Sequence, residues 1–327
     1  MKILIIRFSS IGDIVLTTPV IRCLKKQLPD CEIHYLTKYA YRELIEFNPY
    51  ITQRHYLKDD LKDVLPGLTK EKFDLIIDLH HNLRSARVKI ALRRRSISFN
   101  KINFEKWTYV WLKWNIMPLA HIVDRYMVTV RSLGVVNDGD GLDFFISRDE
   151  QIKFEDLPLT HLHGFIAIAI GGNYATKKLP VEILKRLVKQ LSVPVILIGG
   201  KEDERAGEEI RMTDPIKVYN GCGKFSIQQS ASVIRLSKAV ITHDTGMMHI
   251  AAALGKRIVS VWGNTVPAFG MAPYYGLQRE SLSQIAEVKN LWCRPCSKLG
   301  FAKCPLGHFR CMNRQDANAI ASWAEKS

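Results

Sequence analysis

The sequence has no long hydrophobic run near its start. Ile3 to Ile6 form a four-residue apolar stretch before Arg7, which is too short for the core of a signal peptide or for a membrane span. Cysteine occurs in an odd number, seven, which argues against the disulfide framework of a secreted protein. These features predict a cytosolic protein whose thiols are mostly reduced.

Two common nucleotide-binding motifs are missing as well. No G-x-x-x-x-G-K-[ST] occurs, which excludes P-loop chemistry, and the first predicted strand is followed by RFSSIGDIV rather than by G-x-G-x-x-G, which argues against a dinucleotide. The sequence contains no low-complexity tract and no short tandem repeat. Its 47% hydrophobic and 24% charged residues are ordinary for a globular protein, so disordered and fibrous classes have no support.

The order of apolar runs predicts two α/β domains within the 327 residues. A strand, a loop and a helix follow one another in MKILIIRFSSIGDIVLTTPVIRCLKKQ, and GFIAIAIGGNYATKKLPVEILKRLVKQL repeats the arrangement. Further near-continuous apolar runs, as in strands buried on both faces, alternate with helical segments and predict parallel sheets. We expect a first domain over residues 1–155, a second over 156–312, and a linker within 145–163.

Three loops of the second half follow predicted strands and contain glycine and polar residues. HDTGMMHI places polar side chains at the start of a helix, where free backbone N–H groups attract anions. The candidates are Gly172, Asn173, Thr176 and Lys177 in one loop, Gly200 and Glu202 in the next, and Asp244, Thr245, Gly246 and His249 in HDTGMMHI. Together the loops predict a nucleotide diphosphate site, with Lys177 on a phosphate and Glu202 on ribose hydroxyls.

Each loop also has a purely structural interpretation. Asp244 would cap the helix and His249 would be a packed core residue. Lys177 and Lys178 would be solvated, and Glu202 would belong to a solvated acidic loop. Three such loops in one half favour the nucleotide site over any of these interpretations taken singly.

Asp13 lies beside Gly12 at the strand-to-helix turn of the first domain. Open α/β sheets bind ligands at the carboxyl ends of their strands, so this carboxylate would face the ligand crevice. There it would take a proton from an acceptor hydroxyl as a general base. The alternative is that Asp13 only caps the following helix.

Several segments, in order along nearly the whole chain, resemble glycosyltransferase family 9, the lipopolysaccharide heptosyltransferases. They are RFSSIGDIVLTTPVI, DLIIDLHHNLRS, HIVDRYMVTVRSLG, the loop near Lys177, GGKEDE and HDTGMMHIAAALG. The resemblance implies a GT-B fold, in which two Rossmann-like domains with parallel sheets face a central cleft. It also implies that residues 313–327 form a helix that crosses back to the first domain.

The resemblance further implies an inverting, metal-independent transfer of heptose from ADP-heptose to a hydroxyl of the lipopolysaccharide inner core, with no cofactor. Asp13 matches the proposed base, and the three loops match the donor-binding positions. The implied acceptor-binding residues of the first domain are Ser10, Gly12, Asn82, Arg84 and Arg125. The acceptor is then a lipid-linked anionic saccharide at the cytoplasmic face of the inner membrane.

Two departures from the family pattern keep alternatives open. Leu179 stands where many relatives have tryptophan, and His80 and His81 replace a more usual Gln-Gly pair. A GT-B transferase that uses another nucleotide-sugar is therefore the first alternative. A non-catalytic anion-binding or lipid-binding protein is an alternative of another class.

Much of the net charge of +15 lies between Arg84 and Trp114, where nine lysines and arginines stand against Glu105 alone. Trp107, Trp111 and Trp114 recur there at helical spacing, which predicts an amphipathic surface that meets lipid headgroups. The alternative is that the tryptophans pack inward and the cations are solvated. No nucleic-acid reader motif is present, so no specific nucleic-acid partner is expected.

Four of the cysteines cluster late in the chain as C-x2-C-x7-C-x6-C: Cys293, Cys296, Cys304 and Cys311. Four thiolates are a ligand set for structural zinc. The spacing is loose for a zinc knuckle, so reduced, packed cysteines without a metal are the favoured interpretation.

Overall fold

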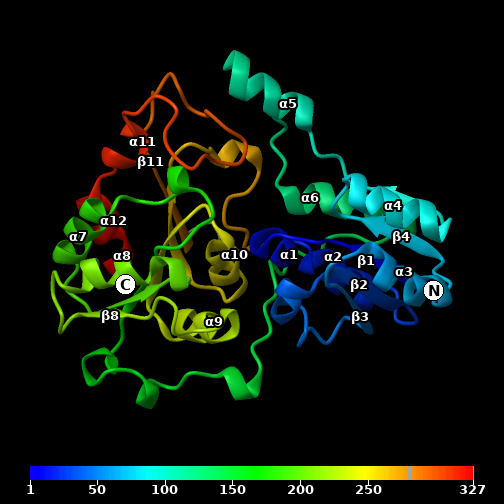
Figure 1. Cartoon of the computed structure of the whole chain (residues 1–327), viewed down its shortest axis with the longest axis horizontal. Helices are drawn as coiled ribbons and strands as arrows, with labels where there is room; N and C mark the ends of the chain where they lie inside the picture. The colour runs from blue at the N-terminus through cyan, green and yellow to red at the C-terminus, as the bar shows by residue number, and fades with distance from the viewer. Residues whose placement is uncertain (278–281, 327) are drawn as a thin grey trace. The chain divides into compact units, whose positions relative to one another are not determined.

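A computed structural model describes residues 1–277 and 282–326, which form two units (Figure 1). Unit 1 comprises Met1–Lys101 and Ala120–Phe145. Unit 2 comprises Ile102–Leu119 and Ile146–Ser327. Each unit has its own sheet and its own apolar core.

The sheet of unit 1 has the strand order β3-β2-β1-β4-β5, and all of its described pairs are parallel. The strands are β1 (Lys2–Ile6), β2 (Glu32–Lys38), β3 (Gln53–Leu57), β4 (Leu75–Asp78) and β5 (Ser96–Ser98). The helices are α1 (Ile11–Val15), α2 (Thr18–Gln27), α3 (Leu61–Lys70), α4 (Leu83–Leu92) and α6 (Ile122–Met127). Ile3 to Ile6 of β1 are fully buried, as a central parallel strand requires.

The sheet of unit 2 has the order β11-β10-β9-β6-β7-β8, again with parallel pairs. Its strands are β6 (Ile166–Ala169), β7 (Val195–Ile198), β8 (Val218–Asn220), β9 (Ala239–His243), β10 (Arg257–Trp262) and β11 (Ser283–Glu287). Its helices are α5 (Asn103–Trp107), α7 (Val181–Gln190), α8 (Glu204–Arg211), α9 (Ile227–Leu236), α10 (Gly246–Ala253), α11 (Arg310–Asn313) and α12 (Ala317–Glu325). Two parallel α/β sheets confirm the predicted fold class.

The apolar runs of the sequence do not predict two of the edge strands, β3 and β11. β3 and β11 are half exposed and contain polar residues, so they have no continuous apolar run. An edge strand pairs on one side only, and this weakens the apolar signal in its sequence. The central strands, which are buried on both faces, are the ones that the apolar runs predict.

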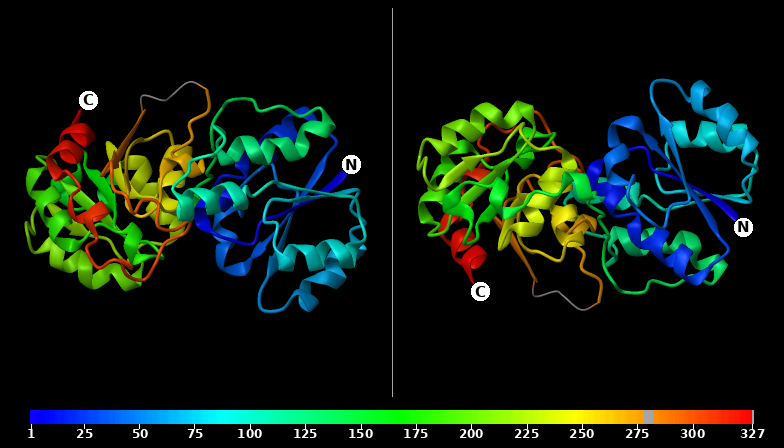
Figure 2. Two further views of the ribbon diagram at one scale, coloured as in Figure 1. Left: turned by 90° about the horizontal axis from the view of Figure 1, so that it is seen from above. Right: turned by 90° about the horizontal axis from the view of Figure 1, so that it is seen from below.

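The structure divides the chain differently from the expected domains. The boundary lies at residues 145 and 146 rather than 155 and 156, and Ile102–Leu119 belongs to unit 2 although unit 1 surrounds it in the sequence. The final helix α12, red in Figure 2, packs on α7, β9 and β10 of its own unit, and the crossing back to the first domain that the resemblance implies stays a prediction. Its apolar residues Ile320, Ala321 and Ala324 join the unit 2 core.

Each sheet has one point where the strand order reverses. In unit 1 this point lies between β1 and β4, and in unit 2 it lies between β9 and β6. At such a point the loops after the two strands run in opposite directions and leave a ligand-binding crevice at the carboxyl ends of the strands. The loops that the sequence singles out, which lead to Asp13, Lys177 and Asp244, all follow strands at these two points.

Candidate active site

In unit 1 the carboxylate of Asp13 is held on both oxygens. Its Oδ1 lies 2.6 Å from Nη2 of Arg7, and its Oδ2 accepts a 2.8 Å hydrogen bond from the Ser10 hydroxyl. Ser10 is the N-cap of α1, and Asp13 is the third residue of that helix, so the alternative of Asp13 as the N-cap is corrected. The Asp13 side chain keeps 23% of its surface exposed, which leaves it accessible to a substrate.

Arg7, the first residue after β1, is itself held by hydrogen bonds to three acceptors. Its Nη1 donates to the backbone oxygen of Leu79 and, over 3.0 Å, to the Tyr126 hydroxyl, while Nε donates to the backbone oxygen of Ser9 over 2.8 Å. The side chain is buried. A guanidinium this constrained sets the position of the Asp13 carboxylate.

The same contacts set the protonation of Asp13. Burial by itself raises the pKa of a carboxyl group, but the Arg7 guanidinium and the hydrogen bonds from Ser10 outweigh it and lower the pKa of Asp13 from its ordinary value. The carboxylate is therefore ionised throughout the neutral range. It is a base that is always available but of modest strength.

Asp78, at the end of β4, organises the neighbouring loop of unit 1. This fully buried carboxylate accepts hydrogen bonds from the backbone N–H groups of His80 and His81, from Ser85 Oγ, and from Lys89 Nζ at 3.0 Å. His81 has φ of 50°, a conformation that glycine adopts most easily. The departure from the usual Gln-Gly pair is thus accommodated by hydrogen bonds to the His81 backbone and ring.

His80 lies beside the Arg7 and Asp13 pair and contacts Phe8 edge to face, with ring centroids 5.2 Å apart. Burial, followed by the positive charge of Arg7, lowers the pKa of His80 to about 4. The imidazole is therefore neutral near pH 7. It can offer a neutral polar group to an acceptor sugar but no positive charge.

The remaining acceptor candidates of unit 1 lie in different surroundings. Asn82 is the N-cap of α4, and its side-chain oxygen accepts from the Ser85 N–H over 2.9 Å. Arg84 is exposed, with its guanidinium 5.7 Å from the Phe8 ring centre, and Arg125 on α6 is buried. Gly12 is buried in α1. Arg84 is thus the accessible cation of this set, and Asn82 is committed to capping.

In unit 2 two adjacent lysines tie three strand-end loops together. Lys177 Nζ lies 2.6 Å from Asp244 Oδ2 in the loop after β9, and Lys178 Nζ lies 2.7 Å from Asp203 Oδ1 in the loop after β7. Both lysines belong to the loop after β6, the strand between β9 and β7. The alternative of two solvated lysines is wrong, because each has a buried or nearly buried carboxylate as its partner.

The start of α10 is open in the way the sequence predicts. Thr245 is the N-cap and Gly246 the first helical residue, so the interpretation of Asp244 as the cap is corrected. Asp244 instead accepts from the Thr265 hydroxyl over 2.8 Å while it pairs with Lys177. The Lys177 ammonium therefore lies at the residue that directly precedes the N-cap of α10, and an ammonium near a helix N-terminus suits a phosphate group.

Close packing explains the glycines of the β6 loop. A Cβ at Gly172 would lie 3.2 Å from the Thr245 methyl group, and one at Gly171 would lie 2.7 Å from Asp203 Oδ2. Gly172 and Thr245 are thus brought together at the switch point. Asn173, the next residue, is exposed.

Two candidate residues of unit 2 have structural partners. The Thr176 hydroxyl accepts from Phe301 N–H over 2.8 Å and lies 3.2 Å from Phe301 O, which fastens the cysteine-rich segment to the lysine loop. His249 is buried in α10, with 2% of its surface exposed. Both residues therefore have the surroundings of structural residues.

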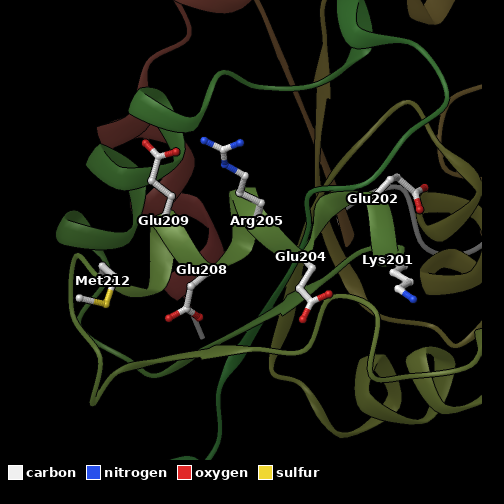
Figure 3. A pocket seen from close by; sticks show the side chains of 7 residues that line it. All are labelled: Lys201, Glu202, Glu204, Arg205, Glu208, Glu209 and Met212. Carbon is white, nitrogen blue, oxygen red and sulfur yellow. The ribbon is translucent and has the colours of Figure 1, made fainter.

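Gly200 and Glu202 lie after β7. The Gly200 N–H donates to Asp203 Oδ2 over 3.0 Å, whereas the Glu202 side chain is exposed. Glu202 and Lys201 also line one end of a shallow hollow of about 450 Å³ that follows α8 (Figure 3). Glu204, Arg205, Glu208, Glu209 and Met212 line the rest of it, so four carboxylates stand against two cations and the walls carry a net negative charge, which disfavours a diphosphate. The switch point, and not this hollow, is the candidate site.

The four late cysteines lie near enough to affect one another electrostatically, but in the described part of the chain no three of their sulfur atoms come within 4.8 Å of one another. Within residues 1–277 and 282–326, His34, His55 and Glu71 are the one set of three ligand atoms that lie within 4.8 Å of one another. Glu71 in that set is paired with Lys2 Nζ at 2.9 Å, which places an ammonium where an ion would bind. Cys293 Sγ instead lies 3.8 Å from His308 Nε2.

Several residues of the two sites are not among those that the sequence predicts. Arg7, Tyr126 and Asp78 surround Asp13 and its neighbouring loop, while Asp203 and Thr265 complete the lysine loop. Arg7 carries a usable signal, because an arginine directly after a buried strand lies at the ligand end of the sheet. The others are recognisable only from contacts between distant parts of the chain.

Comparison with known proteins gives consistent matches. The model of glycosyltransferase family 9 (heptosyltransferase) matches residues 64–298. Lipopolysaccharide heptosyltransferase 1 of Campylobacter coli is 27% identical over 292 residues, 81% of this chain and 84% of that protein.

Two solved structures share the fold. A family 9 glycosyl transferase from Veillonella parvula has a TM-score of 0.72 at 21% identity, over 87% of this chain and 85% of that one. E. coli heptosyltransferase WaaC with ADP has a TM-score of 0.70 at 19% identity, over 99% of both chains. With the two parallel sheets, these matches confirm the GT-B fold. No helix within the described part of the chain has the length and apolar character to cross a bilayer.

Proposed function

The chain belongs to glycosyltransferase family 9, the heptosyltransferase family, and from this premise we propose that it transfers heptose from ADP-heptose to a hydroxyl of the lipopolysaccharide inner core. One observation carries the donor half of this proposal. Lys177 pairs with Asp244, which directly precedes the N-cap of α10 at the switch point of unit 2. An ammonium and free N–H groups together are the groups that bind a diphosphate.

The reaction needs a base and a stabilised leaving group. Asp13 takes the proton from the acceptor hydroxyl, whose oxygen then forms a bond to the anomeric carbon. The bond from that carbon to the diphosphate oxygen breaks, and ADP leaves with the electron pair. Lys177 and the N–H groups of α10 stabilise the negative charge that develops on it. Attack opposite the leaving group inverts the anomeric centre without a metal or a cofactor.

The acceptor is held by unit 1 in this proposal. Arg84, which is exposed at the start of α4, binds an anionic group of the saccharide, and the Ser10 hydroxyl and neutral His80 lie beside the reacting hydroxyl. Gly12 and Arg125 are buried and Asn82 caps α4, so in this proposal the three residues support the acceptor site without binding the saccharide charge. Because such an acceptor is linked to lipid, the enzyme works at the cytoplasmic face of the inner membrane. No nucleic-acid partner is part of this proposal.

Calorimetric titration with ADP, UDP, GDP and their sugar conjugates tests the donor assignment. We expect ADP and ADP-heptose to bind selectively, with affinity that falls as salt rises because the contacts are ionic. Preference for another nucleotide would keep the fold and discard the sugar. Binding of none of them would indicate a non-catalytic protein.

A pH profile of the Arg7→Gln variant tests how Asp13 is activated. In the wild type the lowered pKa of Asp13 places the acid limb of kcat/KM below the ordinary range of a carboxyl group, so acid should not lower activity near neutral pH. In the variant the guanidinium no longer opposes the effect of burial, so the pKa of Asp13 should rise and the acid limb should move to higher pH. Arg7→Lys, which keeps the charge, should leave the limb low. An Arg7→Gln profile as flat as that of the wild type would show that Arg7 has only a structural role.

A further inference from the structure

Tryptophan side chains lie on the outside of the helical arm formed by residues 102–119 of unit 2. Trp107, Trp111 and Trp114 are 50%, 70% and 67% exposed. Trp107 and Trp111 lie four residues apart on α5 and the π-helical turn Thr108–Leu112, and Trp114 follows two residues after the end of this turn. The opposite face of the arm is packed, because Val110 contacts Val266 and Phe269. The alternative that these tryptophans pack inward is therefore wrong.

Lys113 fixes this arm to the cysteine-rich segment. Its Nζ donates to the backbone oxygens of Val110 at 2.7 Å, Cys293 at 3.2 Å and Pro295 at 2.7 Å. Residues from the end of the chain therefore lie beside the arm, although they are about 180 positions away in sequence. The segment that contains them exposes further large apolar side chains: Trp292, Leu299, Phe301 and Leu306.

Lys113 joins the two segments, and we define residues 102–119 and 289–314 together as the aromatic-basic surface. They contain eight lysines and arginines and a single acidic residue, Glu105. Six of the cations are exposed, namely Lys113, Lys289, Lys298, Lys303, Arg310 and Arg314. The arginine cluster at residues 93–95, which the sequence groups with the tryptophans, belongs to unit 1, so this surface draws its charge from the end of the chain instead.

We propose that the aromatic-basic surface docks on an anionic phospholipid bilayer. Tryptophan is favoured at the boundary between headgroups and acyl chains, and each cation near an anionic membrane surface adds attraction. Trp107 and Trp111 are exposed on a helix that is packed at Val110, as in helices that lie in the interfacial plane, and Trp114 is exposed just beyond its end. The inference rests on the proposed function in one respect, since a lipid-linked acceptor explains why the enzyme would bind a membrane. The exposed tryptophans and cations that would bind the bilayer do not depend on that function.

Vesicle binding tests the proposal with full-length protein and no glycolipid present. We expect sedimentation with phosphatidylcholine vesicles that contain about one third phosphatidylglycerol, much weaker binding to pure phosphatidylcholine, and loss of binding at high salt. Trp111→Ala with Trp114→Ala should lower the partition coefficient about tenfold or more. Lys298→Gln with Lys303→Gln should lower it severalfold and flatten its salt dependence.

A matched control uses exposed apolar residues elsewhere in unit 2. Leu159→Ala with Ile216→Ala, at positions 83% and 75% exposed, should bind vesicles as the wild type does. Equal binding by the tryptophan variant and the wild type would overturn the proposal. It would also be overturned by binding that required the saccharide acceptor in the vesicle, or by tighter binding of single-stranded nucleic acid through the same tryptophans.

Titration with ADP separates this proposal from the proposed function. All four proteins should bind ADP equally, since none of the changed residues lies at the switch point of unit 2. Vesicle binding without ADP binding would remove the transferase assignment and keep the membrane surface. ADP binding without vesicle binding would do the reverse.

Discussion

Asp13→Asn is expected to lower turnover about a thousandfold and to leave the affinity for ADP within a factor of two. The amide has nearly the shape of the carboxylate but cannot accept the proton of an attacking hydroxyl, and general-base catalysis contributes on this scale. ADP affinity should persist because Asp13 is in unit 1, whereas Lys177 and α10 are in unit 2. Steady-state kinetics with a soluble acceptor and calorimetry with ADP measure the two quantities.

Two further variants make this result specific. Asp60→Asn changes another N-terminal carboxylate, the N-cap of α3, where asparagine also caps well, so both turnover and stability should stay near wild type. Ser10→Ala removes one hydrogen bond to Asp13 but leaves the carboxylate and Arg7, and should cost severalfold rather than a thousandfold. Unchanged turnover in Asp13→Asn would show that Asp13 is only part of the α1 cap.

Lys177→Ala is expected to weaken ADP binding and to lower kcat/KM about a hundredfold to a thousandfold. The variant loses the cation that balances the developing charge on the diphosphate, and preorganised groups of this kind contribute on that scale. It also leaves Asp244 with only Thr265 as a partner at the start of α10, where its charge repels a phosphate. Calorimetry and initial rates measure both effects.

The pairing of Lys177 with Asp244 makes a double variant informative. Lys177→Ala with Asp244→Ala removes the repulsion together with the attraction, so its ADP affinity should lie above that of Lys177→Ala alone. Lys185→Ala is a suitable control, since this lysine pairs with Glu182 and Glu209 on the surface of the same unit and should not affect binding. ADP affinity as high in Lys177→Ala as in the wild type would remove Lys177 from the phosphate site.

The fold and the location of the site are largely readable from the sequence. A buried parallel strand requires a continuous apolar run, and β1, β4, β6, β7, β9 and β10 each have one. A strand must leave its sheet through a turn, so RFSSIGD, GGNYATKK and HDTG mark the ligand ends of three strands. Both signals are local in sequence. The assignment of single donor and acceptor residues stays a prediction.

The charge pairs within the site are decided by tertiary structure. Arg7 and Asp13 are neighbours in sequence, but what holds Arg7 is Tyr126, 119 positions away. Lys177 contacts Asp244, which is 67 positions away in the sequence, whereas the adjacent Lys178 pairs with Asp203. Sequence patterns show which residues end a strand but not which side chain reaches which partner. The strand order around the switch point determines that.

Two parallel α/β sheets, their glycine-containing loops and a basic, tryptophan-rich segment can all be read from the amino-acid pattern. Three features emerge only once the chain is folded: this segment is divided between the units, with its tryptophans in unit 2, Thr176 is bound to Phe301, and the cysteine-rich end of the chain lies beside the residues that carry the tryptophans. Periodicity and composition express the burial of a residue within its own helix or strand, whereas a contact such as that of Lys113 with Pro295 depends on how distant segments pack.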